Sequence, residues 1–138
     1  MSYAFKLSRV LPASPAEIYE AWLNSATHTA MTGGEAKASK GAGAAYSAWD
    51  GYITGRNLEL AAGERIVQSW RTSEFPQDHP DSKVTIELTA EKDGARLTLT
   101  HEGVPNGQTS YETSCWEDFY FAPMRSYFER VRDNLGER

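Results

Sequence analysis

The sequence predicts an α+β fold in which a curved antiparallel sheet of about six to seven strands wraps around a long C-terminal helix. Three observations predict it. A strand-like segment near the N-terminus precedes two short helical segments, and residues Glu35 to Glu102 then alternate apolar and polar side chains between turn residues. The last segment, Thr109 to Leu135, instead repeats apolar residues at three- and four-residue steps. Because an antiparallel sheet with one apolar face needs a cover, we expect this helix to supply it.

The N-terminal third of the chain predicts one strand and two short helices. Residues Tyr3 to Val10 alternate with the period of a half-buried strand. Ser14-Pro15-Ala16-Glu17 then combines an N-cap residue, a proline at the first helical position and a glutamate placed to cap back. The first helix follows, and a second from about Ser25 to Met31 ends at Thr32-Gly33-Gly34, where glycine favours a helix stop.

The middle of the chain predicts consecutive antiparallel strands separated by turn residues. Their expected ranges are 35–39, which is weak, 44–49, 53–60, 65–72, 83–92 and 96–102. Gly55 and Asn57 predict a bulge or a close backbone approach in the third of these. The loop from Ser73 to Ser82 contains two prolines, and we expect it to be exposed and mobile.

The C-terminal segment predicts an amphipathic helix with one aromatic face. That face carries Trp116, Phe119, Tyr120, Met124, Tyr127, Phe128, Val131 and Leu135. Thr109 and Glu112 have capping-box spacing, and Pro123 predicts a bend because proline removes a backbone donor and crowds the preceding turn. A bend there lifts the N-terminal half, around Cys115 to Tyr120, and leaves room beneath it.

Composition and charge narrow the class of protein. The 138 residues suit one domain, residues 1–138, with 40% hydrophobic and 24% charged residues. The net charge of −5 and the lack of a basic cluster argue against nucleic acid as a partner. No apolar run approaches the roughly 20 residues that span a bilayer, and no targeting signal opens the chain, so we expect a cytoplasmic protein without membrane insertion. The sequence does not settle its oligomeric state.

Several stretches, taken in order and spacing, resemble a known family across nearly the whole chain. They are residues 13–22 after the first strand, 50–55, 64–71, 97–105 and the pair Cys115-Trp116. The chain resembles the helix-grip, or START-like (SRPBCC), superfamily and, within it, the heat-shock-protein-90 ATPase activator homologues. The resemblance implies a cavity between sheet and helix that binds apolar small molecules or, as in co-chaperone relatives, a surface that touches a chaperone. It carries no shared catalytic motif. Cys115 stands where the family commonly has glycine, which adds a side chain where the helix approaches the sheet.

The residues that could carry chemistry mostly have a structural interpretation as well. His28, His79 and His101 lack metal-ligand spacing, so we expect neither a metal nor a cofactor. Cys115 has no partner at motif spacing, which favours a small buried thiol over a nucleophile. His101 is interpreted first as a hydrogen-bonded core-edge histidine and second as a proton donor or acceptor. For Gln68, whose buried amide needs a partner, a ligand and a backbone group are equally favoured.

These observations favour a non-catalytic domain that binds a hydrophobic or aromatic small molecule between the sheet and the C-terminal helix. The expected wall residues are Trp49, Gln68, Trp70, His101, Cys115, Trp116 and Tyr120. One alternative is a cyclase- or hydrolase-type enzyme that uses His101 as general acid or base. Another is a protein-interaction module that contacts a chaperone, which predicts a filled interior and an exposed apolar patch.

Overall fold

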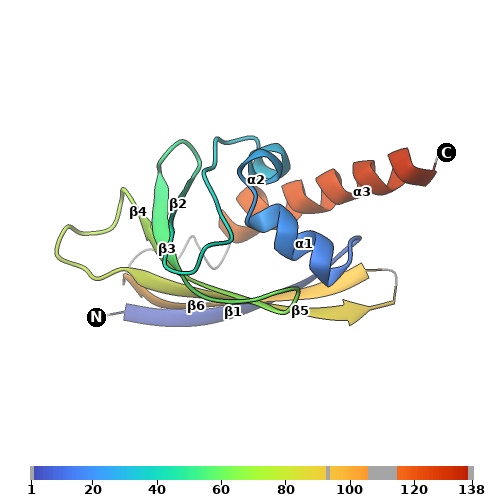
Figure 1. Cartoon of the computed structure of the whole chain (residues 1–138). Helices are drawn as coiled ribbons and strands as arrows, with labels where there is room; N and C mark the ends of the chain where they lie inside the picture. The colour runs from blue at the N-terminus through green and yellow to red at the C-terminus, as the bar shows by residue number, and fades with distance from the viewer. Residues whose placement is uncertain (1, 93, 106–114, 137–138) are drawn as a thin grey trace.

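The fold is a six-stranded antiparallel sheet that carries three helices on one side (Figure 1). The computed structural model describes residues 2–92, 94–105 and 115–136. The strand order is β1-β6-β5-β4-β3-β2. In chain order the elements are β1 (Ser2–Leu11), α1 (Pro15–Trp22), α2 (Ser25–Thr32), β2 (Ala45–Ala48), β3 (Ile53–Ala61), β4 (Arg65–Thr72), β5 (Ser82–Glu91), β6 (Gly94–Pro105), the π-helical turn η2 (Glu117–Phe121) and α3 (Ala122–Gly136). This architecture confirms the predicted fold class.

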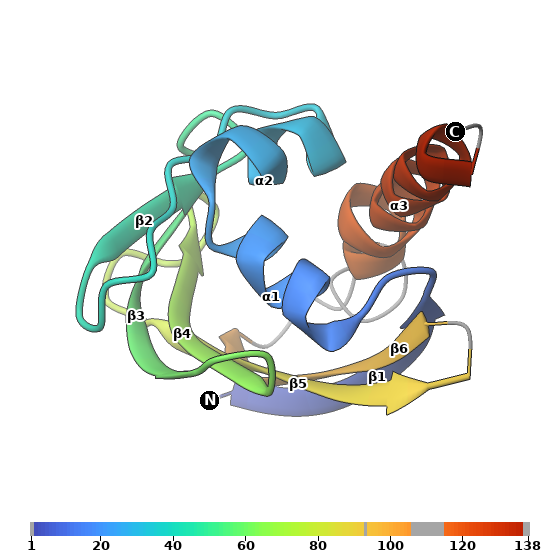
Figure 2. The ribbon, with the colours of Figure 1, turned by 45° about the vertical axis from the view of Figure 1, so that its right-hand side comes forward.

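The sheet curves strongly along the strand order. Figure 2 shows β1, β6 and β5 as a floor and β4, β3 and β2 as a wall that rises beside the helices. All three helices lie on the concave side (Figure 2). The first and last strands in the sequence are neighbours in the sheet. Strand β1 pairs with β6, from Ser2 opposite Pro105 to Leu11 opposite Ala95.

The two short helices begin and end as the sequence predicts. At the start of α1, Ser14 Oγ accepts from the Glu17 N–H at 3.1 Å, and the Ser14 N–H donates to Glu17 Oε1 at 2.8 Å. This capping box satisfies two backbone donors that a helix start leaves open. At the end of α2, Gly33 has a φ of 89°, a left-handed conformation that glycine adopts without strain.

Strand β3 contains both predicted irregularities. Its pairing register with β4 shifts between Asn57 and Glu59, which is a bulge. At Gly55 a Cβ would collide with the Ser69 carbonyl and lie 2.7 Å from the Tyr46 ring. Only glycine fits there, because the neighbouring chain approaches so closely.

The weak strand predicted over residues 35–39 is wrong. Only Lys37 forms an isolated bridge, with Ser47. The flanking N–H groups donate to hydroxyls of α2 instead, Ala36 to Thr29 at 2.9 Å and Ala38 to Ser25 at 2.8 Å. The segment therefore ties α2 to the sheet edge, and no strand forms because its backbone donors are already used.

The C-terminal helix is irregular where Pro123 predicts a disturbance. Pro123 cannot donate to the carbonyl of Phe119, four residues earlier, and its ring crowds that carbonyl. The chain accommodates it with the π-helical turn η2, in which the Ala122 N–H bonds to the Glu117 carbonyl five residues back. The predicted cap at Thr109 and Glu112 and the side chain of Leu135 lie outside the described residues.

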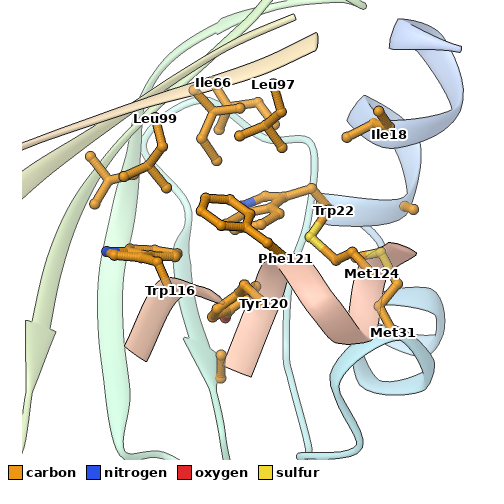
Figure 3. Packing of buried hydrophobic residues seen from close by; sticks show 14 of the residues in the cluster. Ile18, Trp22, Met31, Ile66, Leu97, Leu99, Trp116, Tyr120, Phe121 and Met124 are labelled. Carbon is orange, nitrogen blue, oxygen red and sulfur yellow. The ribbon is translucent and has the colours of Figure 1, made fainter. Parts of the chain in front are cut away.

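The concave side holds the core. Trp116, Tyr120, Phe121, Met124 and Phe128 of the C-terminal segment are buried, as the predicted apolar face requires. Phe119 does not follow this pattern and is 49% exposed. Figure 3 shows the buried helix side chains facing Ile18 and Trp22 from α1 and Ile66, Leu97 and Leu99 from the sheet. The core thus joins α1, α3 and both parts of the sheet.

Candidate functional site

A pocket of about 490 Å³ lies between the π-helical turn and the wall of the sheet formed by β2, β3 and β4. Its side chains come from the β2–β3 loop, from β3 and β4, from the loop after β4 and from the start of the C-terminal helix. They are Trp49, Tyr52, Ile53, Trp70, Glu74, Cys115, Trp116, Phe119 and Tyr120. The sheet and the helix therefore leave room between them at the predicted place.

Aromatic rings form most of the pocket wall. Trp70 and Trp116 lie 5.6 Å apart between ring centroids, and Trp116 and Tyr120 lie 5.0 Å apart. Across the pocket lining, Trp49 and Phe119 meet edge to face at 5.3 Å. Such contacts hold large rings in fixed positions, because edge-to-face and tilted arrangements match the ring quadrupoles.

Trp116 is fixed by a buried hydrogen-bond chain behind the wall. Its Nε1 donates to His101 Nδ1 at 3.2 Å. Since Nδ1 accepts this bond, the ring proton is on Nε2, which donates to Ser82 Oγ at 2.9 Å. The Ser82 hydroxyl in turn donates to the Trp70 carbonyl at 2.6 Å. This series of hydrogen bonds links two wall residues, Trp70 and Trp116, through His101 and Ser82, which do not line the pocket.

His101 is a neutral framework residue. Its side chain is fully buried, and burial lowers its pKa to about 3. Both ring nitrogens are occupied, and His101 is not among the described pocket-lining residues. His101 thus lies behind the pocket wall in which the sequence placed it, and this arrangement gives no support to His101 as a general acid or base.

Tyr120 is held by a second buried histidine, which the sequence analysis did not select. The Tyr120 hydroxyl lies 3.0 Å from His28 Nε2. The other nitrogen, His28 Nδ1, lies 2.8 Å from the Trp22 carbonyl, so it carries the proton and Nε2 accepts from Tyr120. Burial lowers the pKa of His28 and raises that of Tyr120. The spacing of His28 and Met31 on one face of α2 is a signal from which the burial of His28 could have been predicted.

Gln68, another predicted wall residue, lies in the framework behind the wall and is not among the described pocket-lining residues. Its amide nitrogen donates to Asn57 Oδ1 at 2.8 Å, and Trp22 Nε1 donates to its carbonyl oxygen at 3.2 Å. The Asn57 amide continues to the carbonyls of Ser39 at 3.0 Å and Gly41 at 2.9 Å. The partner of Gln68 is thus neither a ligand nor a backbone group but two side chains from α1 and β3.

The other predicted wall residues do line the pocket, namely Trp49, Trp70, Cys115, Trp116 and Tyr120. Tyr52, Ile53, Glu74 and Phe119 line it as well, and the sequence analysis did not name them as wall residues. Trp49 Nε1 is covered and, within the described part of the chain, is a buried side-chain polar atom without a hydrogen-bond partner. Because it is covered, the surface that Trp49 offers to the pocket is carbon.

The described residues include one thiol and no metal-ligating cluster. No three histidine, cysteine, aspartate or glutamate side chains among them are grouped to hold a metal ion. Cys115 is a free, half-buried thiol at the pocket wall. No helix in the described ranges is long and apolar enough to cross a membrane.

A curved antiparallel sheet that holds a C-terminal helix, with a pocket between them, defines a domain of the helix-grip, START-like class. A family model confirms the family within this class. The model of "Activator of Hsp90 ATPase homolog 1-like protein" matches residues 12–129, and the chain belongs to this family.

Curated relatives agree with this assignment, and a solved structure agrees with the fold. Over 134 residues, 95% of this chain, the sequence is 29% identical to the activator of 90 kDa heat shock protein ATPase homolog of Dictyostelium discoideum, covering 32% of it. It is 25% identical over 67% of its length to homolog 2 of Mus musculus, covering 28% of that protein. The chain thus spans about a third or less of these relatives. A solved HSP90 activator from Plasmodium falciparum superposes with a TM-score of 0.83 at 20% identity, over 92% of this chain and 96% of that one, and shows the same fold.

Proposed function

We propose that this domain binds a hydrophobic or aromatic small molecule in the pocket between the π-helical turn and the sheet wall, without catalysing a reaction. The observation that carries the proposal is the pocket itself, about 490 Å³ with aromatic rings on several sides. Small-molecule sites commonly measure about 300–1,000 Å³ and are lined mostly by apolar and aromatic side chains. A protein-interaction module predicts a filled interior at this place, whereas these residues surround a pocket.

The framework behind the wall supports the same function. His101 and His28 occupy the polar ends of Trp116 and Tyr120, so those rings are positioned before any ligand arrives. A preformed site binds more tightly, because less ordering accompanies binding. Among the described lining residues no acid–base pair or activated nucleophile accompanies the rings, which favours binding over catalysis.

A thermal-shift screen of apolar and aromatic metabolites tests this proposal. A ligand that binds only the folded form stabilises it by about 2.7 kcal/mol when present at about 100-fold its Kd. We expect at least one compound to raise Tm by several degrees. The Cys115→Leu variant, which places a larger side chain at the wall, should lose this shift, and the Cys115→Ser variant, of similar size, should keep it.

The proposal fails if no compound class raises Tm. It also fails if Cys115→Leu and Cys115→Ser respond to a stabilising compound in the same way as the unaltered chain, because the compound would then bind elsewhere.

A second candidate function is contact with an Hsp90-type chaperone in the cytoplasm. What favours it is the family and the names of the relatives, which are activators of the heat-shock-protein-90 ATPase. An interaction module also predicts an exposed apolar patch. Among the described residues, the large exposed apolar side chains are Val10, Leu58 and Phe119, which lie on three separate elements, and Phe119 already lines the pocket. Stimulation of the Hsp90 ATPase by the isolated chain would support this function, and equal ATPase rates with and without the chain would exclude activation.

A further inference from the structure

We infer that the pocket selects organic cations, in which an alkylated ammonium group is attached to an apolar or aromatic body. The inference rests on the proposed function, because it names the ligand class for the same pocket. Three features of the lining carry it: the number of aromatic rings, the position of their polar atoms and the single charged residue.

Aromatic rings supply six of the nine side chains that line the pocket: Trp49, Tyr52, Trp70, Trp116, Phe119 and Tyr120. The face of each ring is the negative end of its quadrupole. A cation within about 6 Å of a ring centroid is attracted to that face, most strongly for tryptophan and most strongly where water is excluded. Three tryptophans around one pocket are therefore a favourable lining for a weakly hydrated ammonium group.

The polar atoms of three of these rings do not offset this preference. Trp116 Nε1 is bonded to His101, and the Tyr120 hydroxyl is bonded to His28, both behind the wall. Trp49 Nε1 is covered. An anionic ligand needs hydrogen-bond donors or a positive charge, and these three side chains do not present donors to the pocket surface.

Glu74 supplies the charge, and it is the one charged side chain among the described lining residues. Lysine, arginine and histidine are missing from that described lining. Arg71, on β4, bonds to the loop that follows this strand. Its guanidinium donates to the carbonyls of His79 at 2.6 Å and Pro76 at 2.8 Å and pairs with Asp81 at 3.1 Å. The formal charge among the described lining side chains is thus negative.

The backbone of the loop that carries Glu74 is anchored, although the Glu74 side chain itself is exposed. The Glu74 N–H donates to Thr72 Oγ1 at 3.1 Å, and the Phe75 N–H donates to the Thr72 carbonyl at 3.1 Å. Phe75 is buried, with its ring 6.1 Å from that of Trp70. The guanidinium of Arg71 lies over Phe75 at 5.5 Å. The segment predicted to be an exposed loop is therefore anchored by a buried ring directly beside the glutamate.

Three probes of similar shape and different charge test the inference. Benzyltrimethylammonium is the cation, neopentylbenzene is its neutral carbon isostere, and phenylacetate is the anion. Proton NMR titrations of the full chain give a Kd for each. We expect benzyltrimethylammonium to bind at least about tenfold more tightly than neopentylbenzene, and phenylacetate to bind most weakly.

The Glu74→Gln variant isolates the carboxylate. It keeps the side-chain length and should raise the Kd of benzyltrimethylammonium about three- to fivefold while leaving that of neopentylbenzene unchanged. Glu64→Gln is the matched control, because Glu64 is exposed, lies outside the pocket and carries the same charge. Its Kd values should equal those of the unaltered chain.

The outcomes separate this inference from the proposed function. If neopentylbenzene binds as tightly as benzyltrimethylammonium, or phenylacetate binds best, the selection for cations is wrong and the apolar binding function stands. If Glu74→Gln and Glu64→Gln weaken cation binding equally, the charge acts at long range and the assignment to Glu74 is overturned. If none of the three probes binds, the inference is contradicted, and the thermal-shift screen decides the proposed function separately.

Discussion

Replacing Gln68 by leucine should destabilise the domain strongly, because Gln68 joins two elements in the core. Its amide accepts from Trp22 Nε1 and donates to Asn57 Oδ1, and all three side chains are buried. Leucine makes neither bond and leaves both groups unsatisfied, each at a cost of about 1–3 kcal/mol. Added apolar burial offsets part of this, so we expect a net loss of about 2–4 kcal/mol. For 138 residues this corresponds to a Tm lower by about 10 °C.

Urea unfolding followed by circular dichroism measures this loss, and Gln77→Leu is the control. Gln77 is exposed in the loop after β4, so the same chemical change there should alter stability by less than about 0.5 kcal/mol. The double variant Trp22→Phe, Gln68→Leu should lose less stability than the sum of the two single variants, because each single change removes the same Trp22–Gln68 bond. If Gln68→Leu is as stable as the control but weakens ligand binding, Gln68 contacts the ligand and our account of the framework is wrong.

Three further predictions concern other parts of the structure. His101 has a pKa of about 3 in the folded chain against 6.5 in the unfolded chain, so the unfolded state binds more protons between these values and stability falls as the pH drops below 6.5. This one residue should lower the free energy of unfolding by about 2 kcal/mol near pH 5 relative to pH 7. Urea titrations at several pH values should therefore show a shallower pH dependence of stability for His101→Gln than for the unaltered chain. Equal pH dependence for the two would contradict a buried neutral ring. Ser14→Ala should cost about 1 kcal/mol by removing the cap of α1, measured as a lower Tm, and an unchanged Tm would show that the capping box adds nothing. Gly55→Ala should cost more than about 2 kcal/mol because its Cβ meets the Ser69 carbonyl, whereas Gly41→Ala, with its nearest neighbour at 3.5 Å, should be nearly neutral; equal Tm values for the two would refute the close approach.

Local patterns in the sequence predicted most of the fold. The capping box at Ser14, the stop at Gly33 and the bulge at Asn57 follow from short-range chemistry, and the structure contains each of them. Alternation also placed Gln68 and His101 on the inner face of the sheet, where both are buried. Inward orientation is set by strand period, which a single sequence shows directly.

The partners of those inward residues could not be predicted, because they are far away in the sequence. Gln68 bonds to Trp22, 46 residues earlier, and His101 to Trp116, 15 residues later. A strand pattern says that an amide points inward but not whether a ligand or a side chain meets it. This is why Gln68 and His101 were assigned to the wall although they belong to the framework behind it.

The remaining differences arise from irregular backbone. The π-helical turn adds a residue to the turn before Pro123, so regular helical spacing misplaces Phe119, which is half exposed at the pocket. Glu74 lies in a loop, where no period indicates which way a side chain points. Both residues line the pocket because of tertiary contacts, such as the Trp49–Phe119 contact and the anchoring of Phe75.

The most direct test of the account is to follow the four tryptophan indole N–H signals by NMR while a stabilising compound from the thermal-shift screen is added. Trp49, Trp70 and Trp116 line the pocket, whereas Trp22 lies in the core and bonds to Gln68. We expect the signals of the three pocket tryptophans to shift in a saturable way with one common Kd, and the signal of Trp22 to change least. Saturable shifts centred on Trp22, or binding that leaves all three pocket signals in place, would contradict a ligand site between the π-helical turn and the sheet.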